Sequence, residues 1–304
     1  MKTGSLARLL GLAAAACLLG CGGGDGGVGP KTGSGSTPVT PTNPVYGLNF
    51  GPYIAFGQVA GDSISSAQLT ALLTDLRGYT QWIRTFGMAR GLEVVPPIAH
   101  QLGFKTAMGA YSPAEFGNLV AATKAGTVDL AIVGNEMLLS GLQSEDQVLA
   151  NLDLVRSQVP AGVPVTYVDT WGTILAHPRL IDAVGVVAVN IYPFWDGVPI
   201  AQALSTLQGE YARVVQAANG KPVIIAETGW PSSGPSVGAA EPSLDNAAAY
   251  FAAVERWARD SNVALFYFEA YDEAWKASVG DYPSWGIWYA SGALKSGMAA
   301  VFQK

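Results

Sequence analysis

The stretch VDLAIVGNE, residues 128–136, decides the fold, because seven further runs along the chain resemble it. An apolar, β-branched interior ends on a glycine, an asparagine and a carboxylate. The other runs are VYGLNF (45–50), QWIRTFG (81–87), FKTAMGA (104–110), VPVTYVDT (163–170), VGVVAVNIY (185–192), KPVIIAE (221–227) and VALFYFEAY (263–271). Short runs that are apolar throughout predict strands of a parallel sheet that is covered on both faces.

Segments with helical character separate these runs. In residues 65–78, Leu69, Leu72, Leu73 and Leu76 repeat at the spacing of one helix face. Similar segments occupy 89–103, 112–126, 144–159, 177–184, 199–219, 243–261 and 291–303. Eight strands that each precede a helix, within about 260 residues, predict an α/β fold: a single (β/α)8 TIM barrel over residues 45–304.

A doubly wound open sheet is the alternative fold. It predicts a glycine-rich phosphate turn after the first strand, and GLNFGPYIAFG (47–57) does not match G-x-G-x-x-G. The composition, with 13% charged residues, a net charge of −6 and no basic cluster, argues against nucleic-acid binding. With only two cysteines, Cys17 and Cys21, the barrel has no thiol pair for a disulfide or a metal site.

The amino-terminal end reads as a targeting segment. Residues 1–20 have a short positive start and an apolar run that is too short to span a bilayer. The sequence Leu18-Leu19-Gly20-Cys21 resembles a bacterial lipoprotein signal, which implies acylation of Cys21; an ordinary secretory signal is the alternative. Gly22, not Asp, follows the cysteine, and this resembles lipoprotein signals sent to the outer membrane of Gram-negative cells. Residues 21–44, rich in Gly, Ser, Thr and Pro, predict a flexible tether, so we expect a lipid-anchored protein of the cell envelope.

Two glutamates stand at the carboxyl ends of the fourth and seventh predicted strands, where a barrel carries its active site. Glu136 follows Asn135, and Glu227 precedes Thr-Gly-Trp-Pro. Two carboxyl groups that face each other across the mouth of the barrel are suited to glycosidic bond cleavage. One acts as proton donor and the other as nucleophile or base. Either glutamate alone would more often be a solvated rim residue, so the pair is the signal.

At these residues the chain resembles glycoside hydrolase family 17, the β-1,3-glucanases and β-1,3-glucanosyltransferases. The motifs are VGNE (133–136), NIYPF (190–194), ETGWPSSG (227–234), YDEAWK (271–276) and WGIW (285–288). The resemblance implies a retaining mechanism on β-1,3-glucan, with Glu136 as acid/base and Glu227 as nucleophile. It implies sugar binding or charge positioning by Asn135, Tyr192, Glu273 and Lys276, with Arg84 and Asn190 as second choices.

Aromatic side chains after the strands are candidates for stacking on sugar rings. They are Tyr53, Phe86, Trp171, Phe194, Trp195, Tyr271 and Trp285. Trp230, directly behind the nucleophile, either walls the site or supports the turn. This chemistry needs no metal or cofactor, and we expect a monomer.

The sequence leaves the outcome of the reaction open. Transfer and hydrolysis share the first half-reaction and differ only in the acceptor, which no short motif reports. Only about 30 residues separate Tyr192 from Val223, so the subdomain that plant members insert there is missing. A surface protein that binds glucan without turnover is the alternative from another class.

Overall fold

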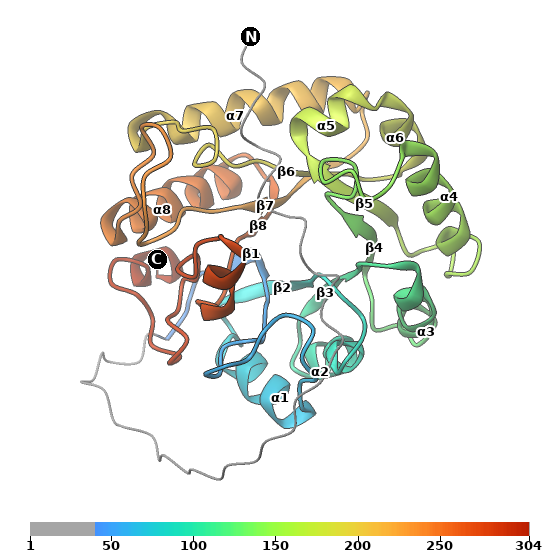
Figure 1. Ribbon diagram of the computed structural model, residues 1–304, viewed down its shortest axis with the longest axis horizontal. Helices are drawn as coiled ribbons and strands as arrows, with labels where there is room; N and C mark the ends of the chain where they lie inside the picture. The colour runs from blue at the N-terminus through green and yellow to red at the C-terminus, as the bar shows by residue number, and fades with distance from the viewer. Residues whose placement is uncertain (1–39, 304) are drawn as a thin grey trace.

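Residues 40–303, which the computed structural model describes, are organised around a closed barrel of eight parallel strands (Figure 1). Each strand pairs with the next along the chain, and β8 pairs with β1. The strands are β1 (Val45–Asn49), β2 (Thr80–Thr85), β3 (Lys105–Ala110), β4 (Leu130–Asn135), β5 (Val165–Thr170), β6 (Val187–Asn190), β7 (Val223–Thr228) and β8 (Ala264–Tyr267). The predicted TIM barrel is confirmed.

Helices on the outside of the barrel connect the strands, as Figure 1 shows. They are α1 (Ser66–Asp75), α2 (Val95–Gln101), α3 (Phe116–Lys124), α4 (Glu145–Arg156), α5 (Trp171–Ala176), α6 (Pro178–Ala183), α7 (Ile200–Ala217) and α8 (Leu244–Asp260). Short 3₁₀ turns complete the order: η2 (Leu92–Val94), η3 (Pro113–Glu115), η4 (Ala274–Val279) and η5 (Ala299–Phe302). Local chemistry sets several starts; at α4, Ser144 and Gln147 form a reciprocal capping box.

Two connections differ from simple helices. The fifth is split into α5 and α6, because Pro178 cannot continue a helix from His177. The helix predicted over 291–303 is wrong, since only the turn η5 forms there. Gly292 and Gly297 both adopt positive φ, at 83° and 82°, which interrupts a helix. Lys295 between them is fully buried, and its ammonium group donates hydrogen bonds to Ser232 after β7 and to Asp272 after β8.

The lumen of the barrel is filled by side chains. Its buried members are Ala107, Leu130, Ile132, Val168, Ala188, Ile224, Ala226 and Phe266. At the amino-terminal end, the rings of Tyr46 and Trp82 stack with centroids 5.7 Å apart, and Phe266 meets both edge-on. A filled lumen leaves the loops beyond the carboxyl ends of the strands as the place for a site.

The chain enters the barrel beside its own carboxyl-terminal end. The backbone N–H groups of Thr42 and Asn43 both donate to the carbonyl of Phe302, at 2.9 and 3.1 Å. The predicted signal (1–20), the lipid site at Cys21 and most of the predicted tether lie outside the described residues. Within residues 40–303, no helix combines the length and apolarity that a membrane crossing requires.

Candidate active site

Glu136 is aimed by an irregular end of β4. The register between β4 and β5 shifts between Ile132 and Asn135, and Gly134 takes φ 85°. Glu136 itself has φ 54°, in the left-handed region that few residues other than glycine adopt. Its backbone N–H still donates to Val168 of β5, at 2.8 Å. Such a bulge re-aims a side chain, and here the carboxyl group reaches Asn190 of β6, whose Nδ2 donates to Oε1 at 2.7 Å.

Glu227 lies near the end of β7 and pairs with Asn190 of β6, at a point where the register between the two strands shifts. Its Oε1 accepts a hydrogen bond from Nη1 of Arg84, at 2.9 Å. Its Oε2 accepts one from the hydroxyl of Tyr192, at 3.0 Å. Both glutamates are buried, with exposed fractions of 4% for Glu136 and 6% for Glu227. The carboxylate of Glu227 is therefore held from both sides.

A polar network connects the two glutamates across the mouth. Nη2 of Arg84 donates to Oδ1 of Asn135, at 2.9 Å, and Nδ2 of Asn190 lies 3.4 Å from the same oxygen. Arg84 also donates to Oδ1 of Asn49, whose own amide is fixed by backbone carbonyls of β7 and β8. The guanidinium is thus held by residues of β1, β4 and β7. It connects two residues that were predicted from separate motifs, Asn135 and Glu227.

The two carboxyl groups have opposite electrostatic surroundings. Burial, followed by the negative charge of Glu227, raises the pKa of Glu136 from 4.5 to about 8, although Asn190 and Arg84 oppose the shift. Oε2 of Glu136 is buried and contacts no hydrogen-bonding partner among residues 40–303. Glu136 therefore carries a proton at neutral pH. Glu227, by contrast, has a cation and a hydroxyl donor on its oxygens.

A second charged group lies beyond β8. Nζ of Lys276 contacts Oε1 of Glu269 and lies 3.0 Å from Oε2 of Glu273. Glu273 also accepts the backbone N–H of Tyr53, at 3.2 Å. Burial lowers the pKa of Lys276, but the two carboxyl groups outweigh it and leave that pKa raised. Lys276 stays an ammonium ion held between these two carboxyl groups.

The sequence did not single out Phe268 as a site residue. Its ring centroid lies 6.2 Å from that of Phe86, 6.1 Å from Tyr192 and 5.7 Å from Trp285. Lys276 lies 4.4 Å from the centre of the Phe268 ring. These contacts join the glutamates to the charged group beyond β8 through one partly buried ring. A signal existed: Glu269 is the first charged residue of the eighth apolar run, VALFYFEAY (263–271), and Phe268 directly precedes it.

Three of the predicted aromatic site residues, Trp285, Trp230 and Tyr271, are buried. Trp285 is buried and packs against Tyr192, with centroids 5.6 Å apart. Trp230 is fully buried, packs on Tyr250, and donates from Nε1 to the carbonyl of Glu241, at 3.0 Å. The hydroxyl of Tyr271 donates to the carbonyl of Leu72 in α1, at 3.0 Å. This geometry favours support for the loops over sugar contact for Trp230 and Tyr271.

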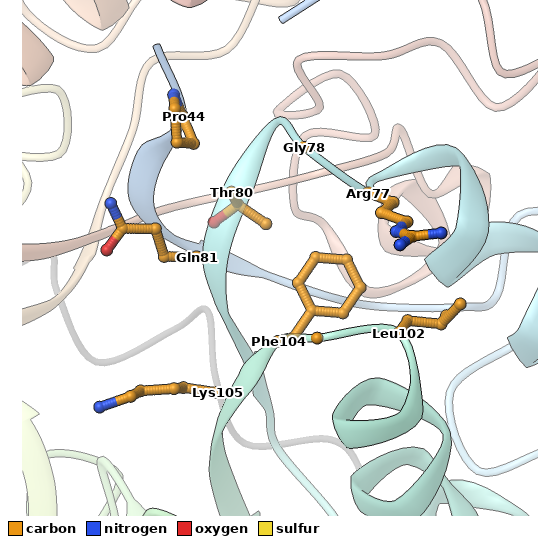
Figure 2. Close-up of a pocket in the computed structure, with 9 residues that line it drawn as sticks. Pro44, Arg77, Gly78, Thr80, Gln81, Leu102, Phe104 and Lys105 are labelled. Carbon is orange, nitrogen blue, oxygen red and sulfur yellow. The ribbon is translucent and has the colours of Figure 1, made fainter. Parts of the chain in front are cut away.

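Two hollows open at the other end of the barrel, at the amino ends of the strands. Figure 2 shows the first, with Gln81 and Lys105 on one side of Phe104 and Arg77 on the other. The second is lined by residues including Tyr46, Trp82 and Ile224. In TIM barrels this face contributes to stability, and chemistry is found at the opposite face. The glutamates belong to that opposite face.

Comparison with known proteins places this geometry among glycoside hydrolases. A family model described as the BtgE/BtgC glycoside hydrolase domain matches residues 47–286. Glucan 1,3-beta-glucosidase BGL2 of Candida albicans is 27% identical over 264 residues, covering 75% of this chain and 84% of that protein. The crystal structure of the glycoside hydrolase family 17 beta-1,3-glucanosyltransferase from Rhizomucor miehei superposes with a TM-score of 0.74 and 27% identity. That match covers 84% of this chain and 96% of the other. An active-site mutant of the Rhizomucor miehei beta-1,3-glucanosyltransferase, in complex with laminaritriose, gives a TM-score of 0.73 and 26% identity, with the same coverage.

Proposed function

The chain belongs to the BtgE/BtgC glycoside hydrolase domain family, and on that premise we propose that it is a retaining glycosidase of β-1,3-glucan. The expected resemblance to family 17 is confirmed, and the chain is a glycosidase. In the proposal, Glu136 is the acid/base and Glu227 the nucleophile. The substrate follows the relatives, a glucan 1,3-beta-glucosidase and a glucanosyltransferase that binds laminaritriose.

One observation carries the assignment of the two roles. Arg84 and Tyr192 hold both oxygens of Glu227, whereas one oxygen of Glu136 has no hydrogen-bonding partner within the described chain. A carboxylate that is oriented by a cation and a hydroxyl donor is suited to attack, and a buried carboxyl group beside that negative charge keeps its proton. The pKa of Glu136, raised to about 8, fits a proton donor that works near neutral pH.

The reaction then proceeds by two displacements. In the first, an oxygen of Glu227 forms a bond to the anomeric carbon while the bond to the leaving sugar breaks, and Glu136 gives its proton to the leaving oxygen. In the second, Glu136 takes a proton from an incoming hydroxyl group, whose oxygen replaces Glu227 on the anomeric carbon. Both carboxyl groups return to their starting forms, and the configuration is retained.

The remaining site residues are assigned to sugar binding. In the proposal, Asn135, whose Oδ1 accepts a hydrogen bond from Arg84, contacts the hydroxyl next to the anomeric carbon. Lys276 and Glu273 offer a cation and a carboxyl group to other hydroxyl groups of the same sugar. The partly buried ring of Phe268, with Lys276 4.4 Å from its centre, is a further candidate for sugar contact.

Transfer to a second glucan is the other candidate outcome. The glucanosyltransferase from Rhizomucor miehei shares this fold over 96% of its length. Both reactions use the intermediate on Glu227, so the same residues serve either one. The acceptor in the second displacement, water or a sugar hydroxyl, separates them.

Product analysis on β-1,3-gluco-oligosaccharides of defined length tests the proposal. We expect shorter products from hydrolysis, or products longer than the substrate from transfer. Glu227→Gln and Glu136→Gln should both abolish turnover, while Glu255→Gln, a buried glutamate of α8 outside the mouth, should not. If the parent binds the oligosaccharides as tightly as Glu227→Gln and turns over none of them, the protein is a glucan-binding protein instead.

We also propose that Cys21 carries a lipid that anchors the barrel to the cell envelope, on the outer membrane. The lipoprotein-like Leu18-Leu19-Gly20-Cys21 and the Gly- and Pro-rich stretch up to Pro44 support this. Labelled palmitate should be incorporated into the parent and not into Cys21→Ser, which should move to the soluble fraction. Equal membrane association of Cys21→Ser would refute the anchor without affecting the proposed reaction.

A further inference from the structure

Asp169 of β5 is a buried carboxyl group that the proposed reaction does not use. It has no exposed surface and lies one strand away from Glu136. Its Oδ1 accepts the backbone N–H of Thr170, at 2.8 Å. Its Oδ2 accepts the hydroxyl of Tyr167, which lies on the same strand. These donors offset the free-energy cost of removing the carboxyl group from water.

The other partners of Asp169 belong to the turn that begins at Glu136. Its Oδ2 accepts the backbone N–H groups of Leu138 and Leu139, at 3.3 and 3.4 Å. The Tyr167 hydroxyl accepts the N–H of Leu138 as well, at 3.0 Å. Asp169 and Tyr167 therefore grip the two residues that follow Glu136 and Met137 in the chain.

This turn needs an external support because its backbone is unusual. Glu136 has φ 54°, a conformation that costs free energy for any residue other than glycine. The carbonyl of Glu136 accepts both the N–H and the hydroxyl of Ser140, at 3.0 and 2.7 Å. Those bonds close the turn on itself, and among residues 40–303 the side chains of Asp169 and Tyr167 fix it to the neighbouring strand β5.

We propose that Asp169 is a positioning residue for the acid/base: it anchors the turn that starts at Glu136 and adds a buried negative charge behind that carboxyl group. The proposal rests on the proposed function. Several other groups also act on Glu136: Glu227 of β7, Arg84 of β2, Asn190 and Tyr192 on the β6 side, and Tyr111 after β3. Asp169 differs from these five groups, because its side chain also bonds the backbone of the Glu136 turn.

The charge of Asp169 shifts the pKa of Glu136 in a direction that can be measured. Its negative charge favours the protonated form of Glu136, so it contributes to the raised pKa of that group. Removing the charge lowers the pKa of Glu136. The protonated acid is then lost at lower pH, and the alkaline limb of the kcat/KM profile moves to lower pH.

The test compares Asp169→Asn, Tyr167→Phe and the surface control Asp153→Asn on α4. Asparagine keeps an acceptor for the turn and loses the charge. Phenylalanine at position 167 keeps the charge of Asp169 but loses two bonds, the one from the Tyr167 hydroxyl to Asp169 and the one from the N–H of Leu138. On a β-1,3-gluco-oligosaccharide, Asp169→Asn should lose up to about 100-fold in kcat and shift the alkaline limb to lower pH. Tyr167→Phe should lower kcat with a smaller shift, and Asp153→Asn should change neither.

A second substrate separates positioning from general damage. With a dinitrophenyl leaving group the first displacement needs no proton donor, so the loss in that step for Asp169→Asn should largely disappear. An Asp169→Asn enzyme with an unmoved alkaline limb, or with equal losses on both substrates, would overturn the inference. If the parent and Asp153→Asn turn over neither substrate, the proposed function fails and this inference fails with it; activity in those two proteins separates the cases.

Discussion

The guanidinium of Arg84 lies 2.9 Å from the carboxylate of Glu227, and the two side chains expose only 1% and 7% of their surfaces. The same guanidinium reaches Asn49 and Asn135, so one side chain fixes three strands at the mouth. The pair is a preorganised charge inside a buried site, where electrostatic interactions are stronger than in water.

Arg84→Lys should therefore lower activity far more than an Arg-to-Lys change elsewhere. Lysine keeps the charge but is a single point donor, and it cannot bond Asn49, Asn135 and Glu227 together. We expect kcat/KM to fall by about 100-fold or more, with the fold retained. Steady-state kinetics on a β-1,3-gluco-oligosaccharide measure this, with exposed Arg179→Lys as control. Equal activity of the two variants would show that the fork geometry is irrelevant.

The pH dependence of activity should report Glu136. Because its pKa is raised to about 8, the proton donor is present through neutral pH and is lost as the pH rises through that value. The kcat/KM profile should decline on its alkaline side near pH 8. On a dinitrophenyl substrate, whose leaving group needs no proton, the alkaline decline of the first displacement should weaken. The same decline on both substrates would assign it to another group.

The pH dependence of stability has a sign that follows from the same pKa. The folded state holds the Glu136 proton more tightly than the unfolded chain, whose pKa is near 4.5. The resulting stability is full below about pH 4.5 and is lost as the pH rises through about 8. Glu136→Gln should thus gain stability over the parent between pH 5 and pH 9, as denaturant unfolding would measure.

Glu255 is the matched control for that experiment. It is fully buried on α8, and burial raises its pKa to about 8 even though Arg259 opposes the shift. One of its oxygens has no hydrogen-bonding partner in the described part of the chain. Glu255→Gln should gain stability over the same pH range and keep full activity, whereas Glu136→Gln loses activity. Two flat stability profiles would mean that neither carboxyl group is protonated in the folded state at neutral pH.

Lys295 is a further buried charged residue with a measurable role. Its ammonium group donates to Oδ1 of Asp272 at 2.7 Å, to Oγ of Ser232 at 2.8 Å and to the carbonyl of Ser284 at 3.0 Å. It therefore connects the loop behind the nucleophile to the loop that carries Lys276. Lys295→Met should lower the free energy of unfolding by about 3 kcal/mol, because it leaves the carboxylate of Asp272, with only 17% of its side chain exposed, without its cation.

The double variant Lys295→Met/Asp272→Asn should recover part of that loss, since no unpaired charge remains. Exposed Lys124→Met, at the end of α3, is the control and should be close to neutral. Urea unfolding of the four proteins gives the comparison. A single variant as stable as the parent would remove the loop connection from the account.

The strands and the two glutamates could be predicted because their signals are local. A parallel strand that is covered on both faces has an apolar interior, so polar residues at its carboxyl end mark the rim, as at Glu136 and Glu227. Phe268 and Glu269 were harder to place, because they follow a strand that ends at Tyr267, and only contacts with Phe86 and Lys276 reveal their positions.

Tyr271 and the last predicted helix show the opposite limit. Past the end of β8 the chain no longer alternates between lumen and exterior, so the direction of Tyr271 depends on the neighbouring α1, where Leu72 accepts its hydroxyl. In residues 291–303, helical spacing competed with two positive-φ glycines and with the buried partners of Lys295. Tertiary contacts decided both cases, and no sequence window contains them.

The assignment of Glu227 as nucleophile is tested most directly by trapping the intermediate. In a 2-deoxy-2-fluoro-β-laminaribiosyl fluoride, the anomeric fluoride ion departs without help from an acid, and the 2-fluoro group slows release of the sugar from the enzyme. The glycosyl-enzyme therefore accumulates and can be digested and mapped by mass spectrometry. We predict one fluorolaminaribiosyl group, attached to Glu227, and none in Glu227→Gln. A label on another residue, or turnover of natural oligosaccharides to products of inverted configuration, would contradict the double displacement.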